Sequence, residues 1–369
     1  MKYIRMAIEK ESPEQFGYEK IKYNLTETSV RDRNIRELGI VLDDILLPYG
    51  DHLGDPRLRR LIAEQSDIED PDCVIVTGGA ASALFLVASS MLESGDHMIV
   101  ARPNYGTNIA TPEAIGADVG YLDLTFEEGF RVDIEKLESM LRPDTKYISL
   151  TNPHNPTGTM MGLEELKRVI AVAEKHNVWL LVDETYRDMF KAERLPVAAS
   201  LSPKVISVSS LSKTYGIPGI RIGWALCRDK EMIERLLCAK EQVCIGGSVV
   251  DEYIGFAALS QKDEWIAKND ALIASRFAIV KKWMEKEELL EWVEPRAACT
   301  CFPRVKESAG VDIEKFYRIM NDKYGTYVGP GHWFGFSDRY MRIGYGWPLE
   351  EELKAGLAGI SAALREAKA

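Results

Sequence analysis

Several reactive side chains of this sequence stand directly after short apolar runs, at the points where strands would end. Asp183 closes the run VWLLVD, Tyr186 follows it, and Asn155 lies in the loop NPHNPTG after KYISLT. Open α/β sheets bind ligands at the carboxyl ends of their strands, so these residues are candidates for a shared site. An aspartate ending so apolar a run needs a cation or hydrogen-bond donor as partner, unless it caps a helix.

A lysine among small hydroxyl residues is a candidate nucleophile. Lys213 lies in SVSSLSKTYG, three residues after Ser210, and Arg221 follows in PGIRIGW. A nearby positive charge can lower the pKa of a lysine and make it nucleophilic. Taken alone, a lysine in this setting is most often a solvated surface residue.

Two further strand ends could contact a flat anionic ligand. Ala80 and Ala81 lie in the small-residue turn TGGAAS before a predicted helix, whose N-terminus would attract a phosphate. Such a turn more often reflects close packing, and its spacing matches neither the P-loop nor the GxGxxG fingerprint. Tyr105, after HMIVAR, could stack on an aromatic ligand or simply belong to the core.

Alternation of apolar runs with helical stretches predicts a mostly parallel sheet with helices on both faces. Helical apolar spacing runs from Gly79 to Glu93 and from Leu163 to His176. The predicted strands are CVIVT at 73–77, HMIVAR at 97–102, KYISLTN at 146–152, VWLLVDE at 178–184 and KVISVSS at 204–210.

A second, smaller unit is expected after a long helical stretch without strong breakers. Its elements are a helix in DIEKFYRIMNDKYG, the turn GPGHWFG, the strand YMRIGYG and a last helix from Glu350. The predicted organisation is an N-terminal segment associated with the small domain, a large domain, a connecting helix and a small α+β domain, at 1–30, 31–255, 256–285 and 286–369.

Composition narrows the classes of function. The 369 residues carry a net charge of -11 without a continuous basic stretch, which argues against a nucleic-acid partner. Neither a secretory leader nor a membrane-spanning run is evident, so we expect a cytoplasmic protein without membrane contacts. The six cysteines indicate neither disulfides nor a metal site, although Cys299 and Cys301 could share one strand face.

Taken together, the motifs NPHNPTG, VDETY and SLSKTYGIPGIRIGW resemble those of the class I/II aminotransferases, which are fold type I enzymes dependent on pyridoxal 5′-phosphate (PLP). The resemblance runs from about Tyr49 to Gly344, with the motifs in the family's order. It implies a large PLP-binding domain, amino-acid and 2-oxo-acid substrates, and a homodimer with shared sites. No metal is implied.

The resemblance assigns a role to each motif residue. Lys213 matches the Schiff-base lysine and proton carrier, and Asp183 matches the partner of the pyridine nitrogen. The remaining matches are Tyr105 for stacking on the ring, Asn155 and Tyr186 for its phenolic oxygen, and Ala80, Ala81, Ser210 and Arg221 for the phosphate.

Substrate-binding residues follow from the same resemblance. Arg342 in YMRIGYG matches the arginine that binds the α-carboxylate, for which a planar guanidinium is well suited. Tyr49 and Gly54 resemble the segment that reaches the neighbouring subunit's phosphate. Asn155 would also border the substrate. The segment YNLTETS at 23–29 matches the family only loosely, and Trp224, Trp333 and Phe334 could line the pocket or belong to the core.

Three functions remain open at this point. Amino-group transfer between an L-amino acid and a 2-oxo acid needs only the residues above. A PLP-dependent lyase or cyclase acting at Cβ or Cγ would use the same lysine, aspartate and arginine, because pocket geometry decides the later steps. A PLP-sensing regulator would need a DNA-binding module, for which the segment before Tyr49 is too short.

Overall fold

The computed structural model describes residues 1–43, 45–189 and 194–368. Its main sheet has seven strands in the described chain, in the order β2-β8-β7-β6-β5-β3-β4. β3 to β7 run parallel to one another, whereas β8 is antiparallel to both β2 and β7. The strands are β2 (Val74–Thr77), β3 (His97–Arg102), β4 (Asp118–Asp123), β5 (Thr145–Thr151), β6 (Trp179–Asp183), β7 (Val205–Ser210) and β8 (Gly223–Leu226).

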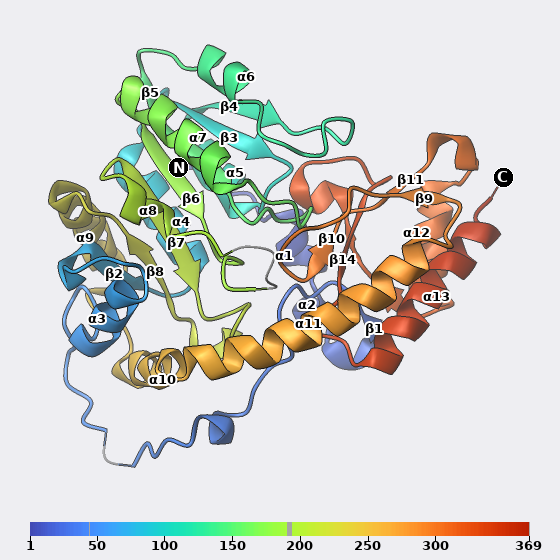
Figure 1. Ribbon diagram of the computed structural model, residues 1–369, viewed down its shortest axis with the longest axis horizontal. Coiled ribbons are helices and arrows are strands. Elements are labelled where there is room, and N and C mark those ends of the chain that lie inside the picture. The colour runs from blue at the N-terminus through green and yellow to red at the C-terminus, as the bar shows by residue number, and fades with distance from the viewer. Residues whose placement is uncertain (44, 190–193, 369) are drawn as a thin grey trace.

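Helices cover both faces of this sheet, which confirms the α/β prediction (Figure 1). Apolar side chains alternate between the faces along each strand. On β3, Ile99 packs in the core beneath α6 and α7, whereas Met98 and Val100 pack under α4 and α9. The helices of this domain are α3 (Pro56–Glu64), α4 (Ala80–Met91), α5 (Thr107–Ile115), α6 (Ile134–Ser139), α7 (Leu163–Lys175), α8 (Ala198–Leu201) and α9 (Lys230–Cys244).

All five predicted strands form in the sheet, as β2, β3, β5, β6 and β7. The predicted helices at 79–93 and 163–176 appear as α4 and α7. Sequence reasoning missed β4 and β8. β4 lies at the edge of the sheet and carries Asp118, Gly120 and Asp123, which weaken its apolar pattern. β8 is only four residues long and begins at Gly223.

The long helical stretch is divided in two. α10 (Val249–Leu259) ends at a turn formed by Ser260 and Gln261, and α11 (Lys262–Met284) then runs from the large sheet to the C-terminal helix (Figure 1). The helix predicted over 256–285 therefore begins at Lys262. Residues 256–259 belong to α10, and 260–261 form the turn. The side chain of Gln261 donates a hydrogen bond to the carbonyl of Leu38 at this turn.

The C-terminal part forms a separate apolar core. α11 and α13 (Glu350–Glu366) pack with α12 (Ile313–Asp322) around Met341 and Ile343 of β14 (Met341–Gly344). Short strands complete this part: β9 (Leu290–Glu291), β10 (Thr300–Cys301), β11 (Arg304–Val305), β12 (Thr326–Tyr327) and β13 (Gly329–Pro330). Cys299 and Cys301 are both buried here with free thiols.

The N-terminal residues pack against this second core. β1 (Tyr23–Asn24) pairs with β12 in parallel, and Leu25 is fully buried in the C-terminal core. The short helices α1 (Ala7–Glu11) and α2 (Pro13–Phe16) precede β1. The Glu11 carboxylate accepts hydrogen bonds from His332 and Trp333, which ties α1 to the turn GPGHWFG.

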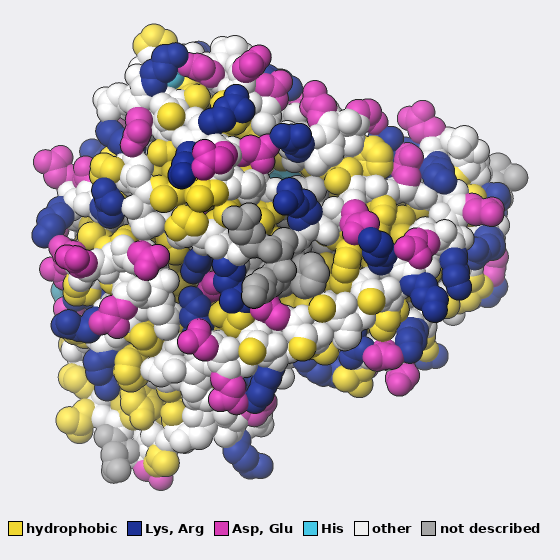
Figure 2. Space-filling model, in the orientation of Figure 1, with side chains coloured by type: hydrophobic (Ala, Val, Ile, Leu, Met, Phe, Trp, Pro, Cys, Tyr) yellow, Lys and Arg dark blue, Asp and Glu magenta, His cyan; other side chains and the backbone are white. Residues whose placement is uncertain are grey.

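Residues 31–43 and 45–50 leave this region and run along the lower edge of the molecule in Figure 1 towards α3. This segment exposes Leu46, Leu47 and Tyr49, the last with 90% of its surface accessible. Basic and acidic side chains are interspersed over the face drawn in Figure 2. No helix in the described ranges is long and apolar enough to span a bilayer.

Candidate active site

The carboxyl ends of β3, β5, β6 and β7 lie at one edge of the sheet and carry the predicted site residues. Asp183 ends β6, between Thr151 of β5 and Val208 of β7. Tyr105 follows β3, and Ser210 ends β7 three residues before Lys213. The parallel ladder thus brings together residues that are more than a hundred positions apart in the chain.

Asp183 is only 5% exposed and is bonded by neutral donors. Its Oδ1 atom accepts hydrogen bonds from the Thr185 hydroxyl at 2.6 Å and the Thr185 amide at 3.1 Å. Burial raises the pKa of Asp183, and bonds from Thr185 and Asn108 offset this only in part. A buried carboxylate in this state is stabilised by any cation placed beside it.

Asn108 belongs to a buried amide network beneath Tyr105. The Asn104 side-chain oxygen accepts bonds from the Asn108 amide at 3.1 Å, the Thr151 hydroxyl at 2.9 Å and the Tyr105 backbone at 2.7 Å. This network connects the ends of β3 and β5 to the first turn of α5. It fixes the start of the loop that carries Tyr105.

Lys213 lies among groups of both signs. Burial by itself would lower the pKa of Lys213, but Tyr186 and Glu27 outweigh it and the net direction is upward. The lowering expected from a neighbouring Arg221 is therefore wrong. The arginine that lowers the pKa of Lys213 is Arg342, and the opposite effect of Tyr186 and Glu27 is larger. The charges of Lys213 and Asp183 both act on the pKa of Tyr105, which indicates that these three side chains share one site.

Arg342 reaches the site from β14 and is 6% exposed. Its Nη1 donates to Asn155 Oδ1 at 3.1 Å and its Nη2 donates to the Thr26 carbonyl at 2.9 Å. The guanidinium also lies 4.8 Å from the centre of the Phe334 ring. Its Nε has no hydrogen-bond partner in the described chain. A buried donor left in this state is costly, so the site is built to receive an acceptor.

The N-terminal segment covers this group of residues. The Thr28 hydroxyl lies 2.7 Å from the Tyr186 hydroxyl, and the Val30 amide donates to the Lys213 carbonyl at 3.1 Å. Sequence reasoning did not assign roles to Thr26 and Thr28. The loose match of YNLTETS to the family gave no signal, because the contacts use a backbone carbonyl and a common hydroxyl.

Arg221 and the first turn of α4 form the opposite end of the site. Gly79 has φ of +88°, and a Cβ there would lie 2.5 Å from Arg221 Nη2. Arg221 Nη1 donates to the Pro218 carbonyl at 2.8 Å. No side chain caps α4, which begins at Ala80 and is fully described. Its first amides and the guanidinium suit an anion such as phosphate.

The three large aromatic residues have different positions. Phe334 lies beside Arg342 and so borders the site. Trp333 donates its indole N–H to Glu11 at 2.7 Å, which places it in the contact with α1. Trp224 lines a small pocket with Glu184 and Lys262.

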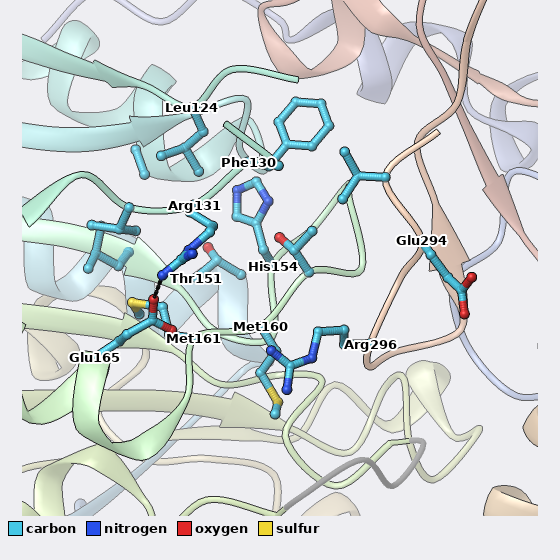
Figure 3. Close-up of a pocket in the computed structure, with 16 residues that line it drawn as sticks. Leu124, Phe130, Arg131, Thr151, His154, Met160, Met161, Glu165, Glu294 and Arg296 are labelled. Atoms are coloured by element: carbon cyan, nitrogen blue, oxygen red, sulfur yellow. Dashed lines mark hydrogen bonds and ion pairs between the residues drawn. The ribbon is translucent and has the colours of Figure 1, made fainter. Parts of the chain in front are cut away.

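A separate pocket of about 470 Å³ lies on the other side of the NPHNPTG loop (Figure 3). It is lined by apolar side chains and by His154 and Arg296, and an Arg131–Glu165 ion pair of 2.6 Å crosses it. None of the predicted cofactor residues lines it. His154 is the residue that connects the two places, since its Nε2 donates to the Pro103 carbonyl at 2.9 Å.

Tyr49 does not contribute to the site of its own chain. Its side chain is exposed on the segment that leads to α3, whereas Gly54 packs against Val76 at the end of β2 with φ of +119°. No cluster of His, Cys, Asp or Glu within the described ranges could hold a metal ion. Cys299 precedes β10 and Cys301 ends it, and both are buried in the C-terminal core.

Comparison with known proteins agrees with this geometry. The family model of class I and II aminotransferases matches residues 22–360. Capreomycidine synthase of Streptomyces vinaceus is 30% identical over 335 residues, which cover 87% of this chain and 82% of that protein.

Two solved structures have the same fold. A PLP-dependent aminotransferase of Streptococcus suis superposes with a TM-score of 0.91 at 29% identity, over the whole of both chains. The PLP-dependent cyclase OrfR has a TM-score of 0.89 at 26% identity, over 99% of this chain and 98% of its own. The chain therefore belongs to the class I and II aminotransferase family, with the fold type I architecture and pyridoxal 5′-phosphate as its cofactor.

Proposed function

We propose that this enzyme transfers an α-amino group between an L-amino acid and a 2-oxo acid, the reaction of a transaminase. The observation that carries this proposal is the buried Arg342 with its unpartnered Nε, beside the strand ends that bear Lys213 and Asp183. A guanidinium in this state is suited to a substrate carboxylate, which it can bind through two parallel hydrogen bonds.

The residues fit PLP on three sides. Asp183, buried and bonded only by neutral donors, would hold the pyridine nitrogen in its cationic form. Tyr105 would stack on the ring, and Asn155 and Tyr186 would donate to its phenolic oxygen. Arg221, Ser210 and the amides of Ala80 and Ala81 would hold the phosphate, because Gly79 leaves room for the guanidinium.

PLP supplies an electron sink for the α-carbon of the bound amino acid. Lys213 would attach the cofactor through its amine and, once the substrate has displaced it, would carry the proton from that α-carbon to the C4′ carbon of the cofactor. Arg342 would orient the substrate by its carboxylate, and Tyr186 would be held in place by Thr28. The covering segment 24–30 would exclude water from this proton transfer.

A homodimer is part of the proposal. Tyr49 and the neighbouring Leu46 and Leu47 are all more than 70% exposed, which is typical of residues covered by a partner. Tyr49 would reach the phosphate of the other subunit, in accordance with the family resemblance. We place the enzyme in the cytoplasm, which suits its unpaired cysteines.

A PLP-dependent cyclase or lyase is the second candidate. The structural likeness to OrfR, which is described as a cyclase, favours it over more distant alternatives. The two reactions share Lys213, Asp183 and Arg342 and differ in what happens at Cβ or Cγ. The cofactor residues therefore cannot choose between them, but the products can.

The test is to incubate the holoenzyme with each of the twenty amino acids, first alone and then with 2-oxoglutarate. Transamination predicts a change in the cofactor spectrum without an acceptor, and an oxo acid with equimolar glutamate when the acceptor is added. Ammonia, pyruvate or a cyclised amino acid would instead support the second candidate. A spectrum unchanged by every amino acid would contradict the transaminase proposal.

A further inference from the structure

Glu27 occupies a fixed position at the edge of the site. Its neighbours Thr26 and Thr28 contact Arg342 and Tyr186, respectively. Its own carbonyl packs so closely on Gly344 of β14 that a Cβ there would collide with it. The backbone of Glu27 is therefore held between the substrate arginine and the ring-binding tyrosine.

The carboxylate of Glu27 has a neutral partner. Its Oε1 accepts a hydrogen bond from the Tyr18 hydroxyl at 3.3 Å, and no Lys or Arg in 1–43, 45–189 or 194–368 forms an ion pair with it. The charge nevertheless acts on the site, since it raises the pKa of Lys213 and opposes the lowering of the pKa of Arg342 caused by burial.

Glu9 provides a second negative charge from another segment. Met6, which precedes helix α1, and Ile8 of α1 pack on Gly106 in the loop after β3. After burial, Glu9 is the largest cause that raises the pKa of Tyr105. The Glu9 carboxylate is half-buried and, like that of Glu27, forms no ion pair with any described side chain.

The cations already at the site, Lys213 and Arg342, have other partners if the proposed function holds, and the inference below rests on that function. Lys213 is committed to the cofactor. Arg342, 6% exposed and with its Nε unpartnered, points to a ligand carboxylate. A carboxylate bound there lies beside Thr26, the chain neighbour of Glu27.

We propose that Glu27, assisted by Glu9, selects amino-acid substrates whose side chain ends in a cation, a guanidinium or an ammonium group. Such a group would pair with two carboxylates that have no cationic partner among the described residues, in a partly desolvated site where charge-assisted bonds are strong. A second carboxylate on the substrate would meet like charge and is disfavoured.

The experiment measures binding of carboxylates that cannot react, so its readout is independent of turnover. Calorimetry on the holoenzyme compares 5-guanidinopentanoate with pentanoate, and 5-dimethylaminopentanoate separates an ammonium from a guanidinium. We expect the guanidino compound to bind ~10- to 100-fold more tightly than pentanoate, the range of a hydrogen bond to a charged group. The inference is wrong if the wild-type enzyme binds the two equally.

Glu27→Gln keeps the shape of the side chain and removes its charge. We expect this variant to lose most of the preference while its affinity for pentanoate stays the same, and Glu9→Gln to lose less. Glu135→Gln, an exposed change on α6, is the matched control and keeps the full preference. An undiminished preference in both Glu27→Gln and Glu9→Gln would also overturn the inference.

These outcomes are separable from those for the reaction type. An enzyme that prefers the guanidino compound but converts no amino acid contradicts the transaminase proposal and leaves the binding inference standing. An enzyme that transaminates neutral amino acids and binds the two compounds equally contradicts the binding inference and leaves the transaminase proposal standing. If Glu27→Gln does not fold, the wild-type affinities alone decide.

Discussion

The sheet edge and the N-terminal segment build the two halves of the site in different ways. At the sheet edge, Asp183 is held between two neighbouring strands and by side chains of the amide network below it. The N-terminal segment is anchored by β1, which pairs through only two residues, by the buried Leu25 and by individual bonds at Thr26, Thr28 and Val30. The proposed cofactor half is therefore rigid by construction, whereas the substrate half depends on few bonds.

The comparison predicts that changes at the sheet edge abolish chemistry, whereas changes in the covering half adjust it. Lys213→Ala should show the largest effect, a loss of at least ~10³-fold in turnover, because it removes both the attachment point and the proton carrier. Loss of the cofactor's visible absorbance band should accompany it. The exposed Lys136→Ala on α6 is the control, and an active Lys213→Ala enzyme would end the proposal.

His154, in the loop after β5, provides a test of how rigidly the sheet edge is built, through the pH dependence of the free energy of unfolding. Burial lowers the pKa of His154 to about 4 from 6.5, against a smaller opposing effect of its bond to the Pro103 carbonyl. The folded state therefore binds the proton less readily than the unfolded chain. The contribution of His154 to stability should be constant above pH 6.5 and fall by up to about 3 kcal/mol as the pH drops from 6.5 to 4.

This part of the pH dependence should disappear in His154→Asn, whatever the variant's stability at neutral pH. The measurement is the urea midpoint at pH 7.5 and at pH 4.5 for both proteins. Equal losses in the two proteins on acidification would show that His154 is not buried in its neutral form.

Arg342→Ala tests the connection between the two halves. It should raise the KM for the amino acid by ~10- to 100-fold, about 1.5 to 3 kcal/mol for a lost charge-assisted bond, and change kcat less. Arg342→Lys keeps the charge without the planar fork and should recover only part of the affinity. An unchanged KM in Arg342→Ala would contradict its role in binding the carboxylate.

Thr28→Val should show the smallest effect. It removes one hydrogen bond to Tyr186, worth about 1 kcal/mol, and should lower kcat/KM by ~3- to 10-fold. Because Thr28 acts by positioning Tyr186, the pH profile of kcat/KM should shift as well. Thr28→Ser retains the hydroxyl and should behave as wild type, whereas a deficit of equal size in both variants would indicate a packing effect.

Local signals predicted the sheet well. Apolar runs such as KYISLT and VWLLV are buried on both faces and form β5 and β6 as expected. Edge strand β4 and the short β8 escaped because few of their residues are strongly apolar. The break between α10 and α11 also escaped, since Ser260 and Gln261 are compatible with a helix and only a tertiary contact explains the turn. The domain boundaries at 30, 255 and 285 stay predictions.

Site residues were predictable where they form contiguous motifs and were missed where they do not. The strand-end motifs placed Asp183, Tyr186, Lys213 and Tyr105 around one site, although their individual roles stay proposals. The direction of the Lys213 pKa was wrong, because it is set by Tyr186 and Glu27, which the chain brings there from distant positions.

By itself, the sequence determined the α/β class, the positions of five strands and the set of reactive residues at their ends, because burial pattern and motif spacing are local properties of a chain. Only the tertiary structure decided that Thr26, Glu27 and Thr28 lie over those residues. Their position depends on β1 pairing with β12 and on Glu27 packing against Gly344, some three hundred residues later. Contacts at that separation leave no pattern in either segment alone.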